Sequence, residues 1–315
     1  MTTLQLFISS LLNGLSYGLL LFMLAAGLTL IFSLMGVMNF AHAGLYMLGA
    51  YFGYQIASYT SFWVALVVAP LLVGGLGVFI EQYYLRHLHS KGHVHELLFT
   101  FGLVLLIEEF VKLVWGVGAV NHRFPGSLDG TLFEVIGVRF PIYKGFVVCS
   151  AIGSLLLIWL FMNRTKIGLV VRAALTSPDM AASLGHNTRQ IFALVFGIGS
   201  ALAGLAGVVG GAALVTEPAM AAHVGTIIFV VIIVGGLGSL KGALIASMLI
   251  GFLETALVAA NLRLSDLLSV FAGYSAIVDA VLQLKLSQIA PTMPYLLMVL
   301  MLLVRPRGLF GTRNV

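Results

Sequence analysis

Long apolar runs, separated by short polar stretches, follow one another along the whole chain. A helix needs about 20 apolar residues to cross the hydrocarbon core of a bilayer. Residues 41–60, rich in small side chains, and residues 226–240, which close on GGLGS, are ambiguous as spans. With them the pattern predicts about eight to nine membrane segments. The clear spans are expected at residues 6–34, 62–84, 97–116, 142–162, 190–215, 242–260 and 290–304.

Composition supports a membrane protein. The chain has 315 residues, of which 60% are hydrophobic and 9% charged, whereas a soluble domain carries about 25% charged residues. Lipid offers the backbone no hydrogen bonds, so only helices or closed barrels can span it, and the apolar runs lack the alternation of a barrel strand. We therefore expect an all-α, polytopic membrane helical bundle, a single transmembrane domain over residues 1–315, with some segments interrupted or re-entrant.

Basic residues collect in particular loops. Residues 164–189 carry four basic residues against one acid, residues 85–96 carry Arg86 and Lys91, and the C-terminal tail carries arginines and no acid. Loops of this kind stay in the cytoplasm. Residues 117–141 balance their charges and are expected on the other side, which puts the N-terminus outside if both ambiguous stretches cross. The net charge of +5 therefore belongs to loops and does not indicate a nucleic-acid partner.

Small residues spaced four apart recur in the predicted spans. Such spacing lets membrane helices approach closely, so we expect a tightly packed bundle. The residues are Gly14 with Gly18, Gly49 with Gly53, and Ala203 with Gly207 and Gly211.

Residues 262–287 have a different pattern. Asp266, Asp279 and Gln283 lie on one helical stripe, and apolar residues cover much of the remainder. This pattern favours an amphipathic helix at the membrane interface. A further span with its polar stripe facing the bundle is the alternative.

The stretch NFAHAGLYMLGAY, residues 39–51, places two polar residues at expected membrane depth. Asn39 follows SLMG and precedes small residues, so we expect a break between two helical pieces with Asn39 as the cap of the second. Broken helices at this depth are either buried in protein or line a watery route, and transporters place them at the substrate. Asn39 and His42 are therefore candidates for the substrate pathway, with a purely structural turn as the alternative.

Ionisable residues inside spans are costly and often functional. Glu108 and Lys112 are four apart and should form a local ion pair. Glu109 points elsewhere on that helix and could face a cavity, and Glu254 has no basic residue one turn away and needs a partner helix or water. Glu109 and Glu254 join the substrate-pathway candidates, whereas Glu81 is expected to reach for the interface.

Two sequence signatures of enzymes are absent from the chain: it has no phosphate-binding loop and no H-E-x-x-H. The stretch HLHSKGHVHE could ligate a metal, although a solvated loop beside a basic membrane anchor is the simpler interpretation. We expect neither an enzyme nor a cofactor or metal bound by this chain.

Three long stretches resemble the branched-chain amino acid ABC importer permeases, in their H-type subunit. They are GLTLIFSLMGVMNFAHAGLYMLGAY, GLVVRAALTSPDMAASLGHNTRQIFALVFGIGSALAGLAGV and VVIIVGGLGSLKGALIASMLIGFLET, and the ending VLMLLVRPRGLFG is also similar. The resemblance implies a multi-pass permease of the bacterial inner membrane that pairs with an M-type permease. It also implies two ATPase subunits that use ATP on the cytoplasmic face and a periplasmic binding protein that delivers substrate.

The substrates implied are branched-chain or other amino acids, or related small amides and organic acids. An ATP-independent secondary transporter or channel would explain the composition equally well. Secondary transport usually relies on titratable residues near the midplane, and few are available here.

The cytoplasmic loop contains DMAASLGHNT, which resembles the coupling motif of ABC permeases. A short helix there could be capped by Ser177, have Pro178 at its first position and stop at Gly185. The alternative is an ordinary loop helix. The residues that the resemblance assigns to ATPase coupling are Pro178, Ala181, Ala182, Ser183, Leu184, Gly185, Asn187 and Thr188.

Overall fold

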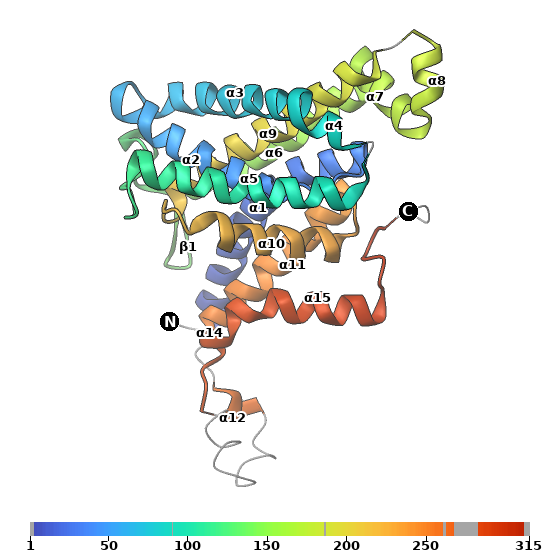
Figure 1. The fold of residues 1–315 in the computed structure, drawn as a ribbon. Coiled ribbons are helices and arrows are strands. Elements are labelled where there is room, and N and C mark those ends of the chain that lie inside the picture. Colours follow the sequence, from blue (N-terminus) through green and yellow to red (C-terminus); the bar gives the residue numbers. More distant parts are fainter. Residues whose placement is uncertain (1–2, 90, 186, 261–262, 268–282, 312–315) are drawn as a thin grey trace.

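The computed structural model describes residues 3–89, 91–185, 187–260, 263–267 and 283–311. Helices dominate these residues and pack into one bundle (Figure 1). The helices are α1 (Thr3–Met35), α2 (Ala41–Tyr59), α3 (Phe62–Ile80), the π-helical turn η1 (Glu81–Leu85), α4 (Arg86–His89), α5 (His93–Trp115), the 3₁₀ turn η2 (Gly126–Leu128), α6 (Ile142–Arg164), α7 (Lys166–Thr176), α8 (Pro178–Ser183), α9 (Thr188–Ala213), α10 (Met220–Gly235), α11 (Leu240–Ala259), α12 (Leu264–Leu267), α14 (Leu286–Ile289), the 3₁₀ turn η4 (Ala290–Thr292) and α15 (Met293–Val304). A short antiparallel hairpin joins β1 (Thr131–Val135) to β2 (Val138–Pro141).

The predicted all-α membrane bundle is confirmed. Among the described residues, 6 helical segments are long and apolar enough to span a membrane: Leu4–Met35, Phe62–His89, Ile142–Arg164, Thr188–Ala213, Leu240–Ala259 and Leu286–Val304. The two ambiguous stretches are also helical, as α2 and the shorter apolar α10. Helix α5 covers the predicted span at residues 97–116. It is continuous and carries several charged side chains.

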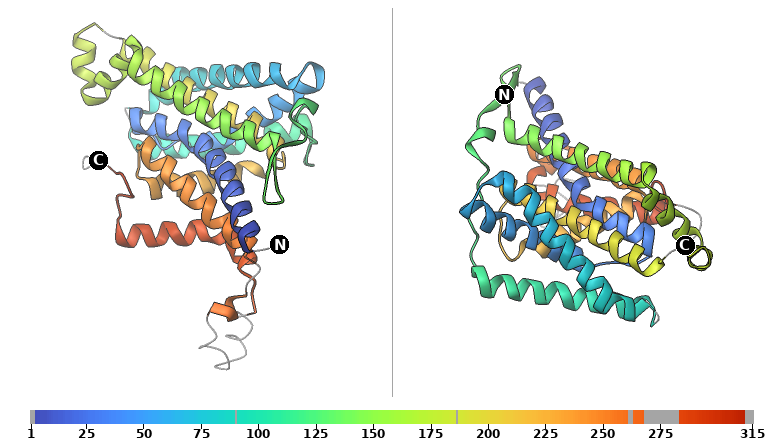
Figure 2. Two further views of the ribbon diagram at one scale, coloured as in Figure 1. Left: turned by 180° about the vertical axis from the view of Figure 1, so that it is seen from behind. Right: turned by 90° about the horizontal axis from the view of Figure 1, so that it is seen from above.

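The loops gather at two opposite ends of the bundle (Figures 1 and 2). At one end the loop before β1 meets the loop after α9, where Val120 N donates to Thr216 O at 2.9 Å, and Gln5 Nε2 donates to Ile136 O. At the other end lie α4, α7, α8 and the C-terminal residues, with Leu309 N donating to Val234 O. The basic segments thus share one end, and the start of α1 lies at the opposite end, as the charge pattern predicts.

Glycines bring helix backbones close together at two crossings. A methyl group on Gly251 of α11 would lie 2.6 Å from the Cα of Gly18 on α1, and one on Gly49 of α2 would lie 2.5 Å from the Cα of Gly204 on α9. Gly207 of α9 is equally enclosed, because a methyl group there would lie 2.7 Å from the amide nitrogen of Ala50. The prediction that the small residues serve tight packing is confirmed at these positions.

The predicted interfacial helix at residues 262–287 falls largely outside the described residues. Of this stretch, residues 263–267 and 283–287 are described. Arg263 Nη1 donates to Gln283 Oε1 at 2.7 Å and Arg263 pairs with Lys285 in an isolated β-bridge, so the two described pieces meet at their base.

His122 fixes the loop between α5 and β1 against the bundle. Its side chain is buried, its ring lies edge-on to Tyr54 of α2 at a centroid distance of 6.3 Å, and neither ring nitrogen has a hydrogen-bond partner. Burial disfavours the charged imidazolium and lowers the pKa of His122 to about 4.

We expect Gly207→Ala to destabilise the bundle by about 1–3 kcal/mol, because the added methyl group overlaps the α2 backbone. The matched control is Gly102→Ala on α5, where a methyl group meets nothing within 4 Å and alanine is the better helix former. Thermal midpoints of the purified chain in detergent compare the two variants. A Gly207→Ala midpoint equal to that of Gly102→Ala would contradict the close crossing.

We expect His122 to make stability depend on pH below 6.5. Its folded-state pKa is lowered, so the unfolded chain binds the proton more tightly, and stability present at neutral pH is lost as the pH falls from about 6.5 towards 4. The loss from this group is at most about 3 kcal/mol. The measurement is the thermal midpoint from pH 7.5 to 4.5, for the natural chain and for His122→Phe. An identical slope in both proteins would show that His122 does not carry the effect.

Candidate transport and coupling sites

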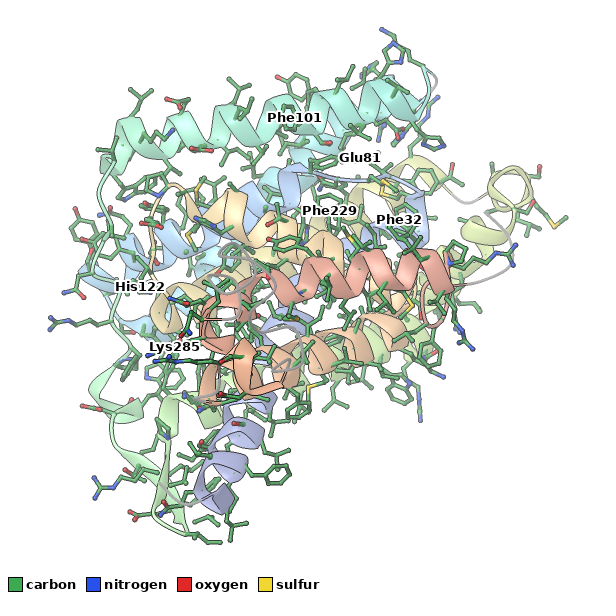
Figure 3. The ribbon with its side chains drawn as sticks, turned by 90° about the horizontal axis from the view of Figure 1, so that it is seen from below. Phe32, Glu81, Phe101, His122, Phe229 and Lys285 are labelled. Atoms are coloured by element: carbon green, nitrogen blue, oxygen red, sulfur yellow. The ribbon has the colours of Figure 1, made fainter. Side chains whose placement is uncertain are left out.

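The chain breaks between α1 and α2, as the sequence predicts. Gly36 adopts a φ of +66° immediately after α1, a conformation that glycine enters without steric cost. The backbone groups of the break find partners on α5, since Phe40 N donates to Thr100 Oγ1 at 3.3 Å and Thr100 Oγ1 donates to Met38 O at 3.4 Å. The Phe40 ring packs against Phe229 of α10 and Phe101 of α5, at ring-centroid distances of 4.4 Å and 6.3 Å. Figure 3 labels these two partners, Phe229 and Phe101.

The prediction that Asn39 caps α2 is wrong. The cap residue is Phe40, whose φ of −67° and ψ of −26° are already helical, and no side chain accepts a hydrogen bond from the first turn. Asn39 contributes its backbone oxygen, which accepts from His42 N at 3.2 Å. Both polar atoms of the Asn39 side chain are buried without a hydrogen-bond partner.

His42, in the first turn of α2, is buried against α1. Its Nε2 is 3.1 Å from Leu24 O, so this nitrogen carries the proton, because a carbonyl can only accept. The ring fits because α1 has a glycine beside it: a methyl group on Gly27 would lie 2.8 Å from His42 Cε1. His42 Nδ1 has no partner. Leaving such a buried atom unpaired costs about 1–3 kcal/mol.

The two carboxylates proposed for the pathway lie elsewhere. Glu254 of α11 interacts with Tyr17 of α1, so its polar neighbour comes from a partner helix, as the sequence required. Glu109 is 66% exposed and pairs with Lys112 at 2.8 Å, and its place in the substrate pathway stays a prediction. The predicted Glu108–Lys112 pair is confirmed at 2.8 Å. The structure therefore brings Asn39 and His42 together but not with Glu109 or Glu254.

Helices α7 and α8 project from the bundle at the basic end (Figures 1 and 2). Thr165 caps α7 by accepting from Gly168 N at 2.9 Å. Ser177 is the cap residue of α8 and Pro178 its first residue, and Gly185 stops the chain with a φ of +85°. The helix starts at the predicted residue, although the Ser177 side chain makes no capping hydrogen bond. It ends at Ser183, with Leu184 as the cap residue and Gly185 directly after it.

The surface of α8 is partly apolar and exposed. Leu184 is 72% exposed and Ala182 is also exposed. Ala181, which the resemblance also assigns to coupling, is buried and does not belong to this surface. Asn187 Oδ1 accepts from Gln190 N at 3.2 Å and caps α9, which begins at Thr188.

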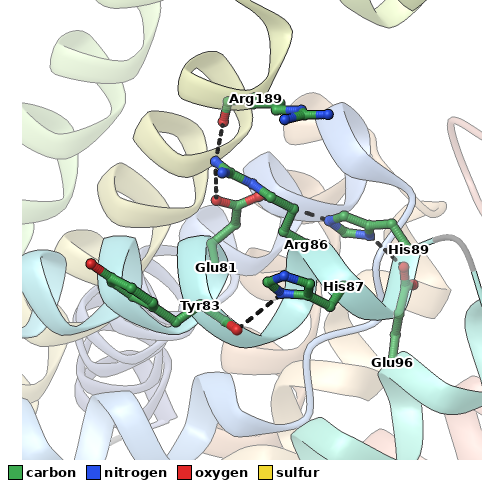
Figure 4. Close-up of polar contacts among 7 residues, drawn as sticks. All are labelled: Glu81, Tyr83, Arg86, His87, His89, Glu96 and Arg189. Atoms are coloured by element: carbon green, nitrogen blue, oxygen red, sulfur yellow. Dashed lines mark hydrogen bonds and ion pairs between the residues drawn. The ribbon is translucent and has the colours of Figure 1, made fainter.

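A buried polar cluster at the same end was not predicted (Figure 4). Glu81, on the turn η1, is buried and lies 3.9 Å from both Arg86 Nη2 and His89 Nε2. The expectation that it reaches the interface is wrong. Glu96 of α5 is also buried and bonds the opposite nitrogen of His89. His89 thus lies between two carboxylates from different helices.

Arg86 extends this cluster to α9. Its Nη2 donates to the backbone oxygen of Arg189 at 3.4 Å (Figure 4). Arg189 is the second residue of α9, so the cluster contacts the chain directly after the projecting loop. Sequence alone shows these charges but not the contact, which joins residues 103 positions apart. The histidine stretch pairs with carboxylates here, and no metal-binding group is found among the residues that the structure describes.

Comparison with known proteins defines the family. Residues 10–304 match the family described as branched-chain amino acid transport system / permease component. The chain belongs to this family, which confirms the resemblance seen in its sequence. Its members are transport permeases, so the chain is a multi-pass transport subunit rather than an enzyme.

Individual relatives agree over long stretches. The high-affinity branched-chain amino acid transport system permease protein LivH of Salmonella typhimurium is 26% identical over 98% of this chain and 97% of the relative. The corresponding protein BraD of Pseudomonas aeruginosa is 27% identical over 79% of this chain and 85% of its own length. The ribose import permease protein RbsC of Escherichia coli is 27% identical over 61% of this chain and 59% of its own length.

Proposed function

We propose that this chain is the permease subunit of an ATP-driven importer for branched-chain or other amino acids, or related small amides and organic acids. The observation that carries the proposal is the projecting α7–α8 element with its exposed apolar tip and its glycine stop. The chain has no phosphate-binding loop of its own, so ATP-driven movement must arrive through contact with another subunit. ATP is used by two partner ATPase subunits, and this chain binds no cofactor.

The remaining partners follow from the two ends of the bundle. A periplasmic binding protein delivers substrate at the end that carries the β1–β2 hairpin, and an M-type permease pairs with this subunit within the bacterial inner membrane. Exposed apolar side chains on α3, α5 and α15 are available to lipid and to that second permease.

The polar cluster of Glu81, Arg86 and His89 can transmit a displacement of the coupling loop to the rest of the bundle. Displacement of α8 pulls on the start of α9, and Arg86 carries the displacement to η1 through Arg189 O and Glu81. Helix α9 crosses α2 through Gly204 and Gly207, so a shift of α9 reaches the break at Asn39 and His42. We propose that their unpartnered polar atoms meet substrate or water when these helices move.

We expect Gly185→Trp to leave the bundle folded and to abolish substrate-stimulated ATP hydrolysis. Tryptophan is strained at a φ of +85° and obstructs docking of the neighbouring Leu184 surface. The measurement is ATP hydrolysis by the assembled complex with and without substrate-loaded binding protein.

The matched control is Gly116→Trp. Gly116 ends α5 at the opposite end of the bundle, has a φ of +89° and has nothing within 4 Å of an added methyl group. It therefore carries the same backbone strain without touching α8. Normal stimulated hydrolysis by Gly185→Trp, with its ATPase subunits retained, would exclude this loop as the coupling element.

A further inference from the structure

A cavity of about 420 Å³ lies between α1, α6, α11 and the end of α9. This volume is within the range of small-molecule sites, about 300–1,000 Å³. It is lined by Pro141 and Phe124 as well, so it lies towards the end of the bundle that carries the β1–β2 hairpin. Neither the break at Asn39 nor the coupling loop contributes to its walls.

One wall of the cavity carries a lysine without an acid. Lys144, in the first turn of α6, is half-buried, and its Nζ donates to Asn13 Oδ1 of α1 at 2.5 Å. Within the described part of the chain no carboxylate lies within ion-pairing distance of it. An ammonium has three donors, and a cation inside a spanning helix is costly unless it meets an anion or water. Lys144 therefore offers free donors and an uncompensated charge to an anionic group in the cavity.

Hydroxyl groups that line the cavity from α1 and α11 offer the opposite polarity. Two of them give their hydrogen to a backbone oxygen: Ser16 to Leu12 O at 3.2 Å and Thr255 to Gly251 O at 2.7 Å. With its hydrogen engaged, each hydroxyl oxygen retains lone pairs for a donor on a ligand.

Apolar side chains form the rest of the cavity. Leu20, Val147 and Leu214 come from α1, α6 and the end of α9, and Phe124 stacks on Tyr143 at a centroid distance of 4.5 Å. The Tyr143 hydroxyl is engaged with Val209 O at 2.6 Å, so its ring is fixed. The cavity therefore combines a cation, hydroxyl groups that can accept hydrogen bonds, and an apolar wall.

We propose that this cavity is a binding site for a zwitterionic α-amino acid with an apolar side chain. Lys144 and Asn13 bind the carboxylate, the hydroxyl oxygens of Ser16, Tyr17 and Thr255 accept from the ammonium, and Phe124, Val147 and Leu214 hold the aliphatic side chain. The choice of an amino acid as the ligand rests on the proposed function. The cavity is then an initial binding site for substrate, near the end of the bundle that carries the β1–β2 hairpin. It is separate from the break at Asn39, whose residues do not line this cavity.

The test is photolabelling of the full chain in nanodiscs with a diazirine analogue of leucine, followed by peptide mapping. The label is expected on the α1 and α6 segments that line the cavity. Excess leucine should compete, whereas 3-methylbutylamine, which lacks the carboxylate, should not. Lys144→Met should reduce the label about tenfold, as the loss of a charge-assisted hydrogen bond would give, and Lys144→Arg should retain part of it.

Lys241→Met is the matched control. Lys241 lines a different cavity at the opposite end of α11, so its removal should leave the label unchanged. Thermal midpoints of all variants verify that each is folded. Label that maps elsewhere, that leucine does not displace, or that survives Lys144→Met would overturn the proposal. Label displaced by phosphatidylglycerol rather than leucine would assign the cavity to lipid and also overturn it.

Leucine uptake by the assembled complex, measured in parallel, separates two kinds of failure. Normal uptake with no label in the cavity would overturn this site alone. Absence of both uptake and label would remove the proposed function and the site together.

Discussion

The close approach of helix backbones at glycines is the interaction on which the rest of this structure depends. In lipid no hydrophobic force draws helices together, so contact relies on backbone proximity and packing. Gly18 meets Gly251 between α1 and α11, and Gly49 meets Gly204 between α2 and α9. These crossings enclose the break after α1 in protein, where its backbone groups can bond to Thr100. Without such enclosure, an irregular segment at this depth would leave polar groups facing lipid.

The close packing at glycines also determines the position of His42. Only a glycine at position 27 leaves room for the ring against α1, and the ring then bonds the backbone of the helix that it touches. Asn39 and His42 hold three polar side-chain atoms without partners in a closed part of the bundle. A structure that keeps such atoms at a helix break can gain hydrogen bonds when the surrounding helices move, which is a property suited to a transport route.

The sequence predicted the features that depend on local spacing. Apolar runs gave the helices, glycines four apart gave the crossings, and Ser177, Pro178 and Gly185 gave the bounds of α8. The sequence did not predict contacts between side chains that are far apart along the chain. Asn39 could not be known to lie one residue before the cap, and Glu81 could not be known to lie beneath Arg86 and His89. The bond between Lys144 and Asn13 joins positions 131 apart, so no local pattern indicates it.

The most direct test of the account is the energy source for uptake. Proteoliposomes containing this chain with its permease, ATPase and binding-protein partners would be loaded with ATP or with a non-hydrolysable analogue, and uptake of radiolabelled leucine would be measured with and without an ionophore that removes ion gradients. If the chain belongs to an ATP-driven importer, uptake requires hydrolysable ATP and binding protein and is unaffected by the ionophore. Uptake without ATP that the ionophore abolishes would identify a secondary transporter and contradict the account.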